Sequence, residues 1–184
     1  MKKLLGLFVI FLGTQAFAAN YTDLALEVGF RQQNGTATGA NLDGKSKIGY
    51  QLGMTAAFPV AEAWSIRTGL MYTERSIKVE SSISTLSESA KFTYVDIPAT
   101  VMYKFVDYAG AYAGVNLSMN LDNDCGSTKC TGVKSMITPF VVGAAFKFAP
   151  QLGGDVFFET MSGEVADNLK DFKAVGAHLM ITFD

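Results

Sequence analysis

The sequence predicts an all-β fold, an eight-stranded antiparallel up-and-down transmembrane β-barrel. Three observations lead to this prediction. Eight segments of about ten residues alternate between apolar and polar side chains, as strands do when one face meets lipid and the other a lumen. The connections between these segments are alternately long and short. After the N-terminal leader, no segment reaches the roughly eighteen consecutive apolar residues of a membrane-spanning helix.

The N-terminus has the composition of a secretory signal peptide. Lys2 and Lys3 form a charged start, residues 4–12 form an apolar core, and Ala16-Phe17-Ala18 supplies the small residues that signal peptidase requires. We therefore expect residues 1–18 to be a signal peptide and residues 19–184 to be one outer-membrane β-barrel domain. The mature chain is then exported, with the bacterial outer membrane as its predicted location.

The first three strands, at 21–31, 48–58 and 64–73, alternate between large apolar residues and glycine, polar or charged residues. Successive side chains of a strand point to opposite faces, so we expect the apolar members to face lipid. These members are Leu24, Leu26, Val28, Phe30, Ile48, Tyr50, Leu52, Met54, Ala56, Phe58, Trp64, Ile66, Thr68, Leu70 and Tyr72.

The fourth strand, 92–105, has a long and regular alternation. Proline has no N–H for the ladder, so we expect a bulge or a bend at Pro98. The apolar row of this strand is Thr93, Val95, Ile97, Ala99, Val101, Tyr103 and Phe105.

The last four strands are expected at 111–121, 136–148, 155–161 and 175–183. The pattern is weakest in the strand at 155–161. The residues expected to face lipid are Ala111, Ala113, Val115, Leu117, Met119, Leu121, Met136, Thr138, Phe140, Val142, Ala144, Phe146, Phe148, Val156, Phe158, Val175, Ala177, Leu179, Ile181 and Phe183.

The long connections are 34–46, 76–91, 122–134 and 162–171. With eight strands and both termini in the periplasm, all four lie outside the cell. The Ser- and Glu-rich stretch 76–91 is expected to be a solvated loop, and its interspersed apolar residues allow the alternative of a hairpin that extends above the membrane.

The two cysteines, Cys125 and Cys130, lie in one of these loops, in a polar segment. An exported chain meets an oxidising environment, so the pair is expected to form a disulfide. A metal site is the weaker alternative because no further Cys or His stands near these two cysteines in the sequence.

A soluble periplasmic barrel or sandwich would show the same alternation, with the apolar face as its core. Two features favour the membrane barrel. Charged residues occur within strands on the polar face but almost never on the apolar face, and glycine is frequent on the polar face. The net charge of −2 does not favour nucleic acid as a partner.

The inward side chains include acids and bases in similar number. Buried charges must pair, so we expect a salt-bridged lumen that is plugged. The alternative is a narrow channel for ions or small solutes, with selectivity set by these charges. The predicted lumen charge network is Glu27, Arg31, Arg67, Asp96, Lys104, Glu159 and His178.

His178 is the only histidine, and it tests the third possibility, a lipid-modifying enzyme. Some small outer-membrane barrels are lipid A deacylases with a Ser and an acid near a His, but Met180 stands where a nearby serine would be expected. We therefore predict that the chain is not an enzyme, with no catalytic residue, no metal and no cofactor.

The C-terminal strand resembles the signal that the barrel-assembly machinery recognises. Leu179, Ile181 and Phe183 alternate toward an aromatic end, although Asp184 follows the phenylalanine. The resemblance implies that this machinery is a partner.

The segment Tyr94-Val95-Asp96-Ile97-Pro98 resembles the strand typical of the PorT-like outer-membrane β-barrel family. The resemblance implies the fold and the location but no single activity. We expect a monomer with a structural or surface-interaction role through its external loops, in contact with outer-membrane lipid and lipopolysaccharide, with any surface ligand unidentified.

Overall fold

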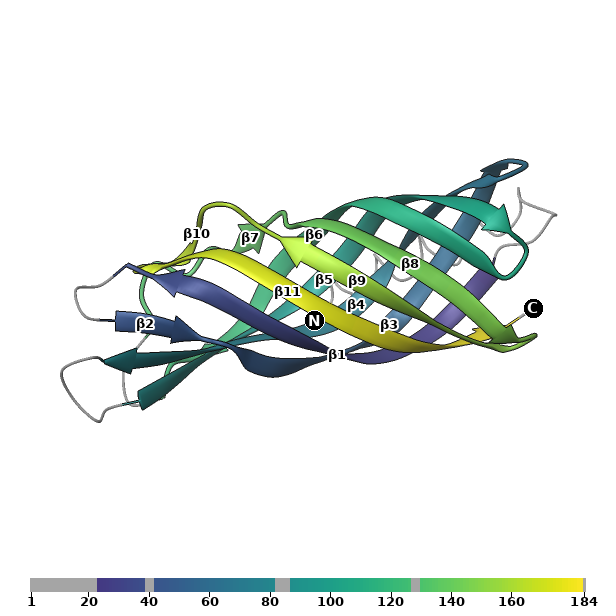
Figure 1. Cartoon of the computed structure of the whole chain (residues 1–184). Coiled ribbons are helices and arrows are strands. Elements are labelled where there is room, and N and C mark those ends of the chain that lie inside the picture. The colour runs from purple at the N-terminus through teal and green to yellow at the C-terminus, as the bar shows by residue number, and fades with distance from the viewer. Residues whose placement is uncertain (1–22, 39–41, 82–86, 127–129, 184) are drawn as a thin grey trace, which may run out of the picture.

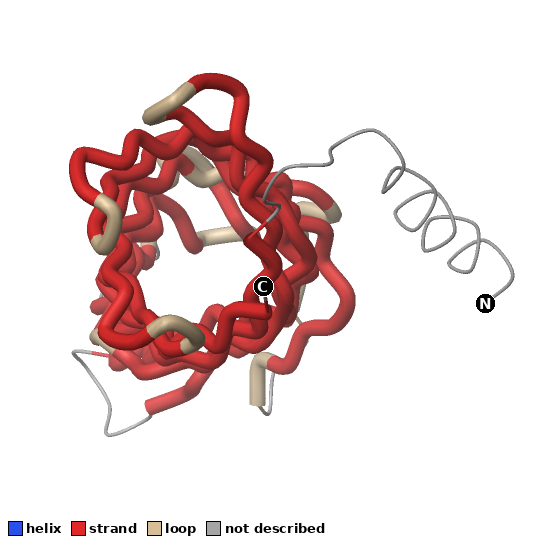
Figure 2. The backbone as a smooth tube through the Cα atoms, turned by 90° about the vertical axis from the view of Figure 1, so that its right-hand side faces the viewer, coloured by secondary structure: helices blue, strands red, loops and turns tan. Residues whose placement is uncertain are grey.

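The computed structural model describes residues 23–38, 42–81, 87–126 and 130–183, so the predicted signal peptide lies outside the described residues. Eight strands pair antiparallel with their neighbours, and the last pairs with the first to close a barrel (Figures 1 and 2). These strands are β1 (Asp23–Ala37), β3 (Lys47–Ala61), β4 (Trp64–Ser81), β5 (Ser87–Val106), β6 (Ala109–Asp124), β8 (Phe140–Ala149), β9 (Leu152–Thr160) and β11 (Leu169–Phe183). The predicted fold class is confirmed.

Three short strands lie at one end of the barrel. They are β2 (Leu42–Lys45), which pairs with β4, β7 (Met136–Ile137), which pairs with β6, and β10 (Glu164–Ala166), which pairs with β11. We call this the loop end, and the opposite end, where adjacent strands are joined by tight turns, the turn end (Figure 1). No helix among the described residues is long and apolar enough to cross a membrane.

The outer surface carries a broad band of exposed apolar side chains. In every wall strand most of the large residues predicted to face lipid are exposed, and many of their neighbours in sequence are buried. The exceptions are Leu24, Phe58, Val95, Ile97 and Val115, which are partly exposed, and the smaller Ala56, which is buried. Val156 and Phe158 face outward on β9, the strand whose pattern was weakest. Exposing this much apolar surface to water is energetically unfavourable, whereas the surface is suited to the hydrocarbon core of a membrane.

Several strands are longer than the sequence predicted. The stretch 76–91 was expected to be a loop, with a hairpin above the membrane as the alternative. The alternative is observed, because β4 continues to Ser81 and β5 begins at Ser87, so most of the stretch is a hairpin that extends the barrel. Paired strands satisfy the backbone N–H and C=O groups that a loop would leave to water.

β5 departs from the predicted pattern at two places. The register shifts between Thr93 and Tyr94, and Thr93 is buried instead of continuing the outer row. At Pro98 the pairing with β4 lapses between Arg67↔Thr100 and Met71↔Asp96, but the register is the same on both sides, so no bulge forms there. The missing N–H interrupts the ladder without inserting a residue.

The loop end contains an apolar core inside the barrel. We call this core the apolar cap, and its buried members are Ile77, Ala90, Phe92, Tyr94, Ile137, Met161, Val165, Ala166, Leu169 and Phe172. They come from β4, β5, β7, β10 and β11 and from the residue after β9, that is, from many sides of the ring. Side chains that converge from so many strands must fill the interior, so the cap occludes this end of the barrel.

Candidate functional site

The candidate site is the lumen below the apolar cap, where buried charged side chains meet in two layers. The layer nearer the turn end is centred on Arg67 of β4. Its Nη2 donates hydrogen bonds of 2.6 and 2.7 Å to the two carboxylate oxygens of Glu27 and one of 3.1 Å to Asp155 Oδ2. The hydroxyl of Thr55 also donates to Glu27, and Tyr112 donates a 3.0 Å hydrogen bond to Asp155.

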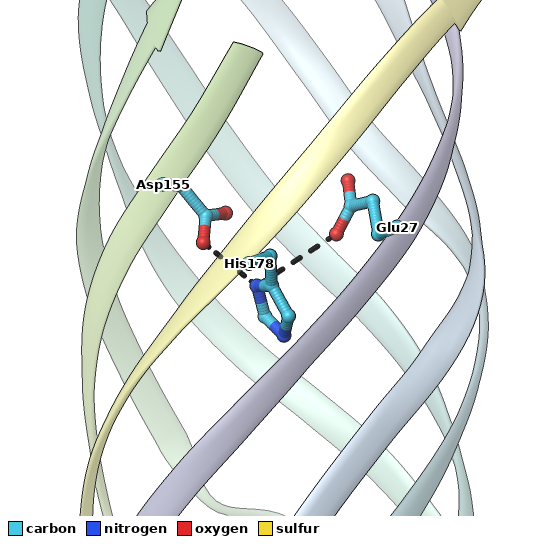
Figure 3. A group of neighbouring side chains, drawn as sticks. All are labelled: Glu27, Asp155 and His178. Carbon is cyan, nitrogen blue, oxygen red and sulfur yellow. Dashed lines mark hydrogen bonds and ion pairs between the residues drawn. The ribbon is translucent and has the colours of Figure 1, made fainter. Parts of the chain in front are cut away.

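His178 of β11 completes this layer between the two carboxylates (Figure 3). Its Nδ1 lies 2.7 Å from Asp155 Oδ1 and 3.9 Å from Glu27 Oε2. Its Nε2 lies 3.1 Å from Gln51 Oε1, and its ring stacks on Phe157 with the centroids 4.9 Å apart. Both ring nitrogens therefore already have partners.

The second layer, nearer the cap, is centred on Arg75 and Glu159. Arg75 donates 3.0 and 2.9 Å hydrogen bonds to the two oxygens of Asp96, and its Nη2 lies 3.1 and 3.2 Å from the oxygens of Glu159. Arg31 Nη2 lies 2.5 Å from Glu159 Oε1, and Asn116 donates a 2.8 Å hydrogen bond to the same carboxylate. One carboxylate thus receives hydrogen bonds from three side chains.

Both layers cross the full width of the barrel. In a closed ring of eight strands, β4 and β9 are separated by three strands in either direction and are therefore opposite each other. Arg67 and Asp155 join these two strands at one level, and Arg75 and Glu159 join them at the other. Each ion pair therefore connects opposite walls of the barrel.

Aromatic rings support the guanidinium groups from the side. Arg67 lies 4.7 Å from the centroid of the Tyr112 ring, and Arg75 lies 5.0 Å from that of Tyr94. Cations at these distances are attracted to the negative face of a ring. Tyr94 also belongs to the apolar cap, so it connects the cap to the charged layer beneath.

Little open space remains among these groups. The cavity between the layers, lined by residues that include Arg67, Asp96 and His178, has a volume of about 30 Å³. That is room for only one or two water molecules. A second cavity of about 90 Å³ opens at the turn end and reaches inward as far as Glu27 and Arg67. The open part of the lumen is therefore a shallow cavity at the turn end that stops at the first charged layer.

The predicted lumen residues are brought together with one exception. Glu27, Arg31, Arg67, Asp96, Glu159 and His178 all belong to the two layers. Lys104 does not: it lies at the turn end, largely exposed, with Nζ 3.1 Å from Asp23 Oδ2. It is the last inward-directed residue before the turn, where water can solvate its charge.

Two network members were missed in the sequence. Arg75 lies two residues beyond the predicted strand, which ends at Thr73, and just before the segment that was expected to be a loop. Asp155 belongs to the same face of β9 as Glu159, at the expected period of two, and its inward orientation was expected, but it was not counted in the charge network. The alternation of β9 was the available signal for Asp155.

The group Glu27, Asp155 and His178 has the residue types of a metal site, with one possible ligand atom of each within 4.8 Å of the others. The guanidinium of Arg67 contacts both carboxylates of this group. A cation would have to compete with that fixed positive charge. Hydrogen bonds and ion pairs inside the protein account for the arrangement.

The external segments above the cap are tied to one another. The N–H of Lys134 donates a 2.8 Å hydrogen bond to Val165 O, and the N–H of Asp167 donates one of 3.0 Å to Thr131 O. Cys125 and Cys130 form a disulfide whose side chains pack against the apolar cap. On the extended hairpin, Lys78 donates a 2.7 Å hydrogen bond to Glu80, and this bond lowers the pKa of Glu80.

Comparison with known structures shows the same architecture. The attachment invasion locus protein Ail of Yersinia pestis, solved in complex with the heparin analogue sucrose octasulfate, is 17% identical, with 88% of this chain and 100% of Ail covered and a TM-score of 0.50. OprG of Pseudomonas aeruginosa is 15% identical, with 88% and 93% covered and a TM-score of 0.50. Neisserial surface protein A is 13% identical, with 87% and 97% covered and a TM-score of 0.53.

These identities are low, so the likeness to the solved structures concerns the fold. No curated protein matches the chain. A family model for the outer membrane protein beta-barrel domain matches residues 14–161, which is most of the chain. The chain therefore belongs to the family of outer membrane proteins with a β-barrel domain and lies in the bacterial outer membrane.

Proposed function

We propose that this protein is a non-conducting outer-membrane barrel that presents a prefolded surface to the outside of the cell. In this proposal the lumen is closed by two seals in series, the charged layers and the apolar cap. The protein acts as a monomer with a structural or surface-interaction role and without catalysis. In outer-membrane barrels the longer loops are external, so the loop end is the outer end.

The observation that carries the proposal is the pair of wall-to-wall ion pairs between β4 and β9. Arg67–Asp155 and Arg75–Glu159 place buried charges across the path that a solute would follow. Opening a path would pull these buried ion pairs apart, at a large desolvation cost. The cavity of about 30 Å³ between the layers leaves no continuous water-filled route.

The apolar cap also supports a non-conducting lumen, because apolar side chains oppose the passage of hydrated ions. Ile77, Phe92 and Val165 are fully buried within it. An ion that entered from outside would have to lose its hydration shell among apolar side chains, which is unfavourable by many kcal/mol. The cap and the charged layers therefore oppose conduction independently.

The external segments support a surface role. The disulfide, the hydrogen bonds between Lys134 and Val165, and the paired hairpin of β4 and β5 hold them in one conformation. A preorganised surface binds a partner without first losing conformational entropy. The ligand of such a surface is not named by this chemistry.

The geometry of His178 supports the non-enzymatic part of the proposal, because its two ring nitrogens face Asp155 and Gln51 instead of a nucleophile. The narrower relation to PorT-like barrels, the signal peptide and assembly through the barrel-assembly machinery remain predictions that the proposal includes. Leu179 and Ile181 lie on the outer face of the last strand, as does Phe183, where that machinery could read them.

The experiment is single-channel conductance of the refolded protein in planar bilayers, with an Arg67→Ala variant alongside and circular dichroism to confirm refolding. The proposal predicts a silent bilayer for the wild-type protein and for the variant, since the cap is intact in both. Reproducible openings of the wild-type protein, with an ion selectivity that changes in the variant, would show instead the narrow channel and would place its selectivity in the lumen.

A further inference from the structure

The dipeptide Asn34-Gly35 lies on β1 near the loop end of the barrel. Asn34 is exposed on the outer face, whereas its neighbour Gln33 is buried. When glycine follows asparagine, its backbone nitrogen can approach the side-chain amide closely, because glycine has no Cβ to obstruct the approach. Every other asparagine of the sequence is followed by leucine, tyrosine or aspartate. Asn34 is therefore the one asparagine of the sequence with this neighbour.

The strand pairing is interrupted around this dipeptide on both sides of β1. On the β11 side the register shifts between Asn34 and Thr36, so Gly35 has no partner position. On the β3 side the pairing ends before Asn34, where Gln33 is paired with Lys47. β2 pairs with β4 and forms no ladder with β1 among the described residues. A local rotation of the backbone at Asn34 and Gly35 therefore disturbs few strand pairings.

Packing explains why glycine occupies position 35. A Cβ atom there would lie 3.0 Å from Cδ1 of Ile77 and 3.0 Å from Cε2 of Phe172, and both of these residues belong to the apolar cap. A larger residue would have to push these side chains aside in a packed core. The cap therefore favours glycine directly after the exposed Asn34.

Lys173 of β11 is the direct cross-strand neighbour of Asn34. Both residues are exposed, and paired residues of adjacent strands project to the same face, so their side chains lie beside each other on the outer surface. None of the ion pairs formed among the described residues involves Lys173. A neighbouring cation stabilises the negative charge that develops on an amide oxygen under nucleophilic attack. It would also pair with a carboxylate formed at position 34.

We propose that Asn34 is a self-modification site, where the side-chain amide is converted to a carboxylate that pairs with Lys173. The backbone nitrogen of Gly35 attacks Cγ of Asn34 and loses its proton, a cyclic succinimide forms, and the side-chain nitrogen leaves as ammonia. Water then opens the ring at either carbonyl and gives aspartate or isoaspartate. No oxidant or reductant is consumed, and both products carry a negative charge. The reaction uses β1, Lys173 and water alone, so it is independent of whether the lumen conducts.

The test is mass spectrometry of the refolded protein after incubation in mildly alkaline buffer made with heavy-oxygen water, followed by digestion in ordinary water. Hydrolysis of the succinimide incorporates the heavy oxygen, so conversion during the incubation is distinguished from conversion during digestion. We expect the label at position 34 to increase with time and to be absent from Asn116 and Asn168, which precede leucine. The Asn34→Gln variant should remain unlabelled at this position.

The contribution of Lys173 is tested with the Lys173→Gln variant, which should be labelled at position 34 more slowly than the wild-type protein. The matched control is Lys134→Gln, which removes an exposed lysine of a different segment and should leave the rate unchanged. The new ion pair is measured by a double-mutant cycle between Asn34→Asp and Lys173→Gln, with the free energy of unfolding as the readout. A favourable coupling between the two positions is expected.

Several outcomes would overturn the proposal. An unlabelled Asn34, under conditions that convert a synthetic peptide of residues 30–38, would show that the folded strand protects the amide. Equal labelling of Asn168 would show that the conversion is not specific to this site. Equal rates for wild-type and Lys173→Gln proteins, or additive effects in the cycle, would remove Lys173 from the account. Circular dichroism of every variant excludes misfolding as the cause of a difference.

Discussion

Arg75 on β4 and Glu159 on β9 face each other from opposite walls of the barrel, with Arg75 Nη2 3.1 and 3.2 Å from the two carboxylate oxygens. Asp96, on the strand next to β4, receives two more hydrogen bonds from the same guanidinium. Both arginine and glutamate are almost completely buried. Arg75 therefore links two carboxylates across the lumen, and Arg31 supplies a second cation to Glu159.

Replacing this arginine should destabilise the barrel strongly. Arg75→Met keeps much of the side-chain volume but leaves Asp96 and Glu159 short of a buried cation, and breaking a buried pair in this way costs about 3–5 kcal/mol. The measurement is the free energy of unfolding by urea in detergent micelles. The control is Lys78→Met, which breaks the exposed pair with Glu80 and should change that free energy by less than about 1 kcal/mol. Equal effects of the two substitutions would contradict the assigned role of Arg75.

Truncation within the apolar cap should loosen the external segments while the membrane-level barrel persists. Phe172 is buried in the cap, whereas Phe158 of β9 faces outward. Phe172→Ala leaves a cavity in a core, so the segment that pairs through Lys134 and Val165 should open more often.

Limited trypsin digestion followed by mass spectrometry measures this opening as the rate of cleavage after Lys134. Faster cleavage is expected for Phe172→Ala than for the wild-type protein or Phe158→Ala. If both variants were cleaved at the wild-type rate, the cap would not hold these segments.

The disulfide should restrain the same segment. Unreduced, denatured protein should show no labelling of Cys125 or Cys130 by a thiol reagent. The double substitution Cys125→Ser with Cys130→Ser removes a constraint on the unfolded segment, so cleavage after Lys134 should accelerate. The heat-dependent gel shift of the barrel should remain, because neither cysteine lies in a wall strand. Labelling of both cysteines without reductant would disprove the bond.

The last aromatic residue should matter for assembly in the cell more than for stability. Phe183→Ala removes the aromatic end of the predicted signal, so less folded protein should reach the outer membrane. Refolding into detergent, which needs no assembly machinery, should give a wild-type yield. Phe148→Ala is the control, since Phe148 is also an exposed aromatic residue of a wall strand. Equal outer-membrane amounts of both variants would show that Phe183 is not read as a signal.

The strand faces were predictable because lipid imposes a period of two on every wall strand. Even Val156 and Phe158, in the weakest strand, are oriented as expected. Charged residues at inward positions of these strands, such as Glu27 and Arg67, follow from the same alternation. Lys104 also follows the alternation, but it lies near the turn end of its strand, where the barrel opens to water.

The apolar cap was beyond prediction from the sequence, because its members are scattered. Ile77 and Phe172 are almost a hundred residues apart, and Val165 lies in a segment of polar composition. Only the closure of the ring brings them together. Arg75 was missed for a related reason: the polar residues that follow it resemble a loop, and pairing with β5 extends the strand beyond the membrane.

The two seals can be tested separately by conductance. Val165→Asp places a charge in the apolar cap without altering a wall strand. Arg67→Ala removes the ion pair that connects opposite walls in one charged layer. Glu164→Asp, at the exposed neighbouring position, is the control for the first substitution. Five proteins are compared in planar bilayers: the wild-type protein, the Val165→Asp and Arg67→Ala variants, their double variant and the Glu164→Asp control.

We predict that the wild-type protein and both single variants are silent and that only the double variant opens, because either seal alone closes the lumen. Openings of the wild-type protein would contradict the closed lumen. Openings of Arg67→Ala with the cap intact would show that the cap does not seal the outer end.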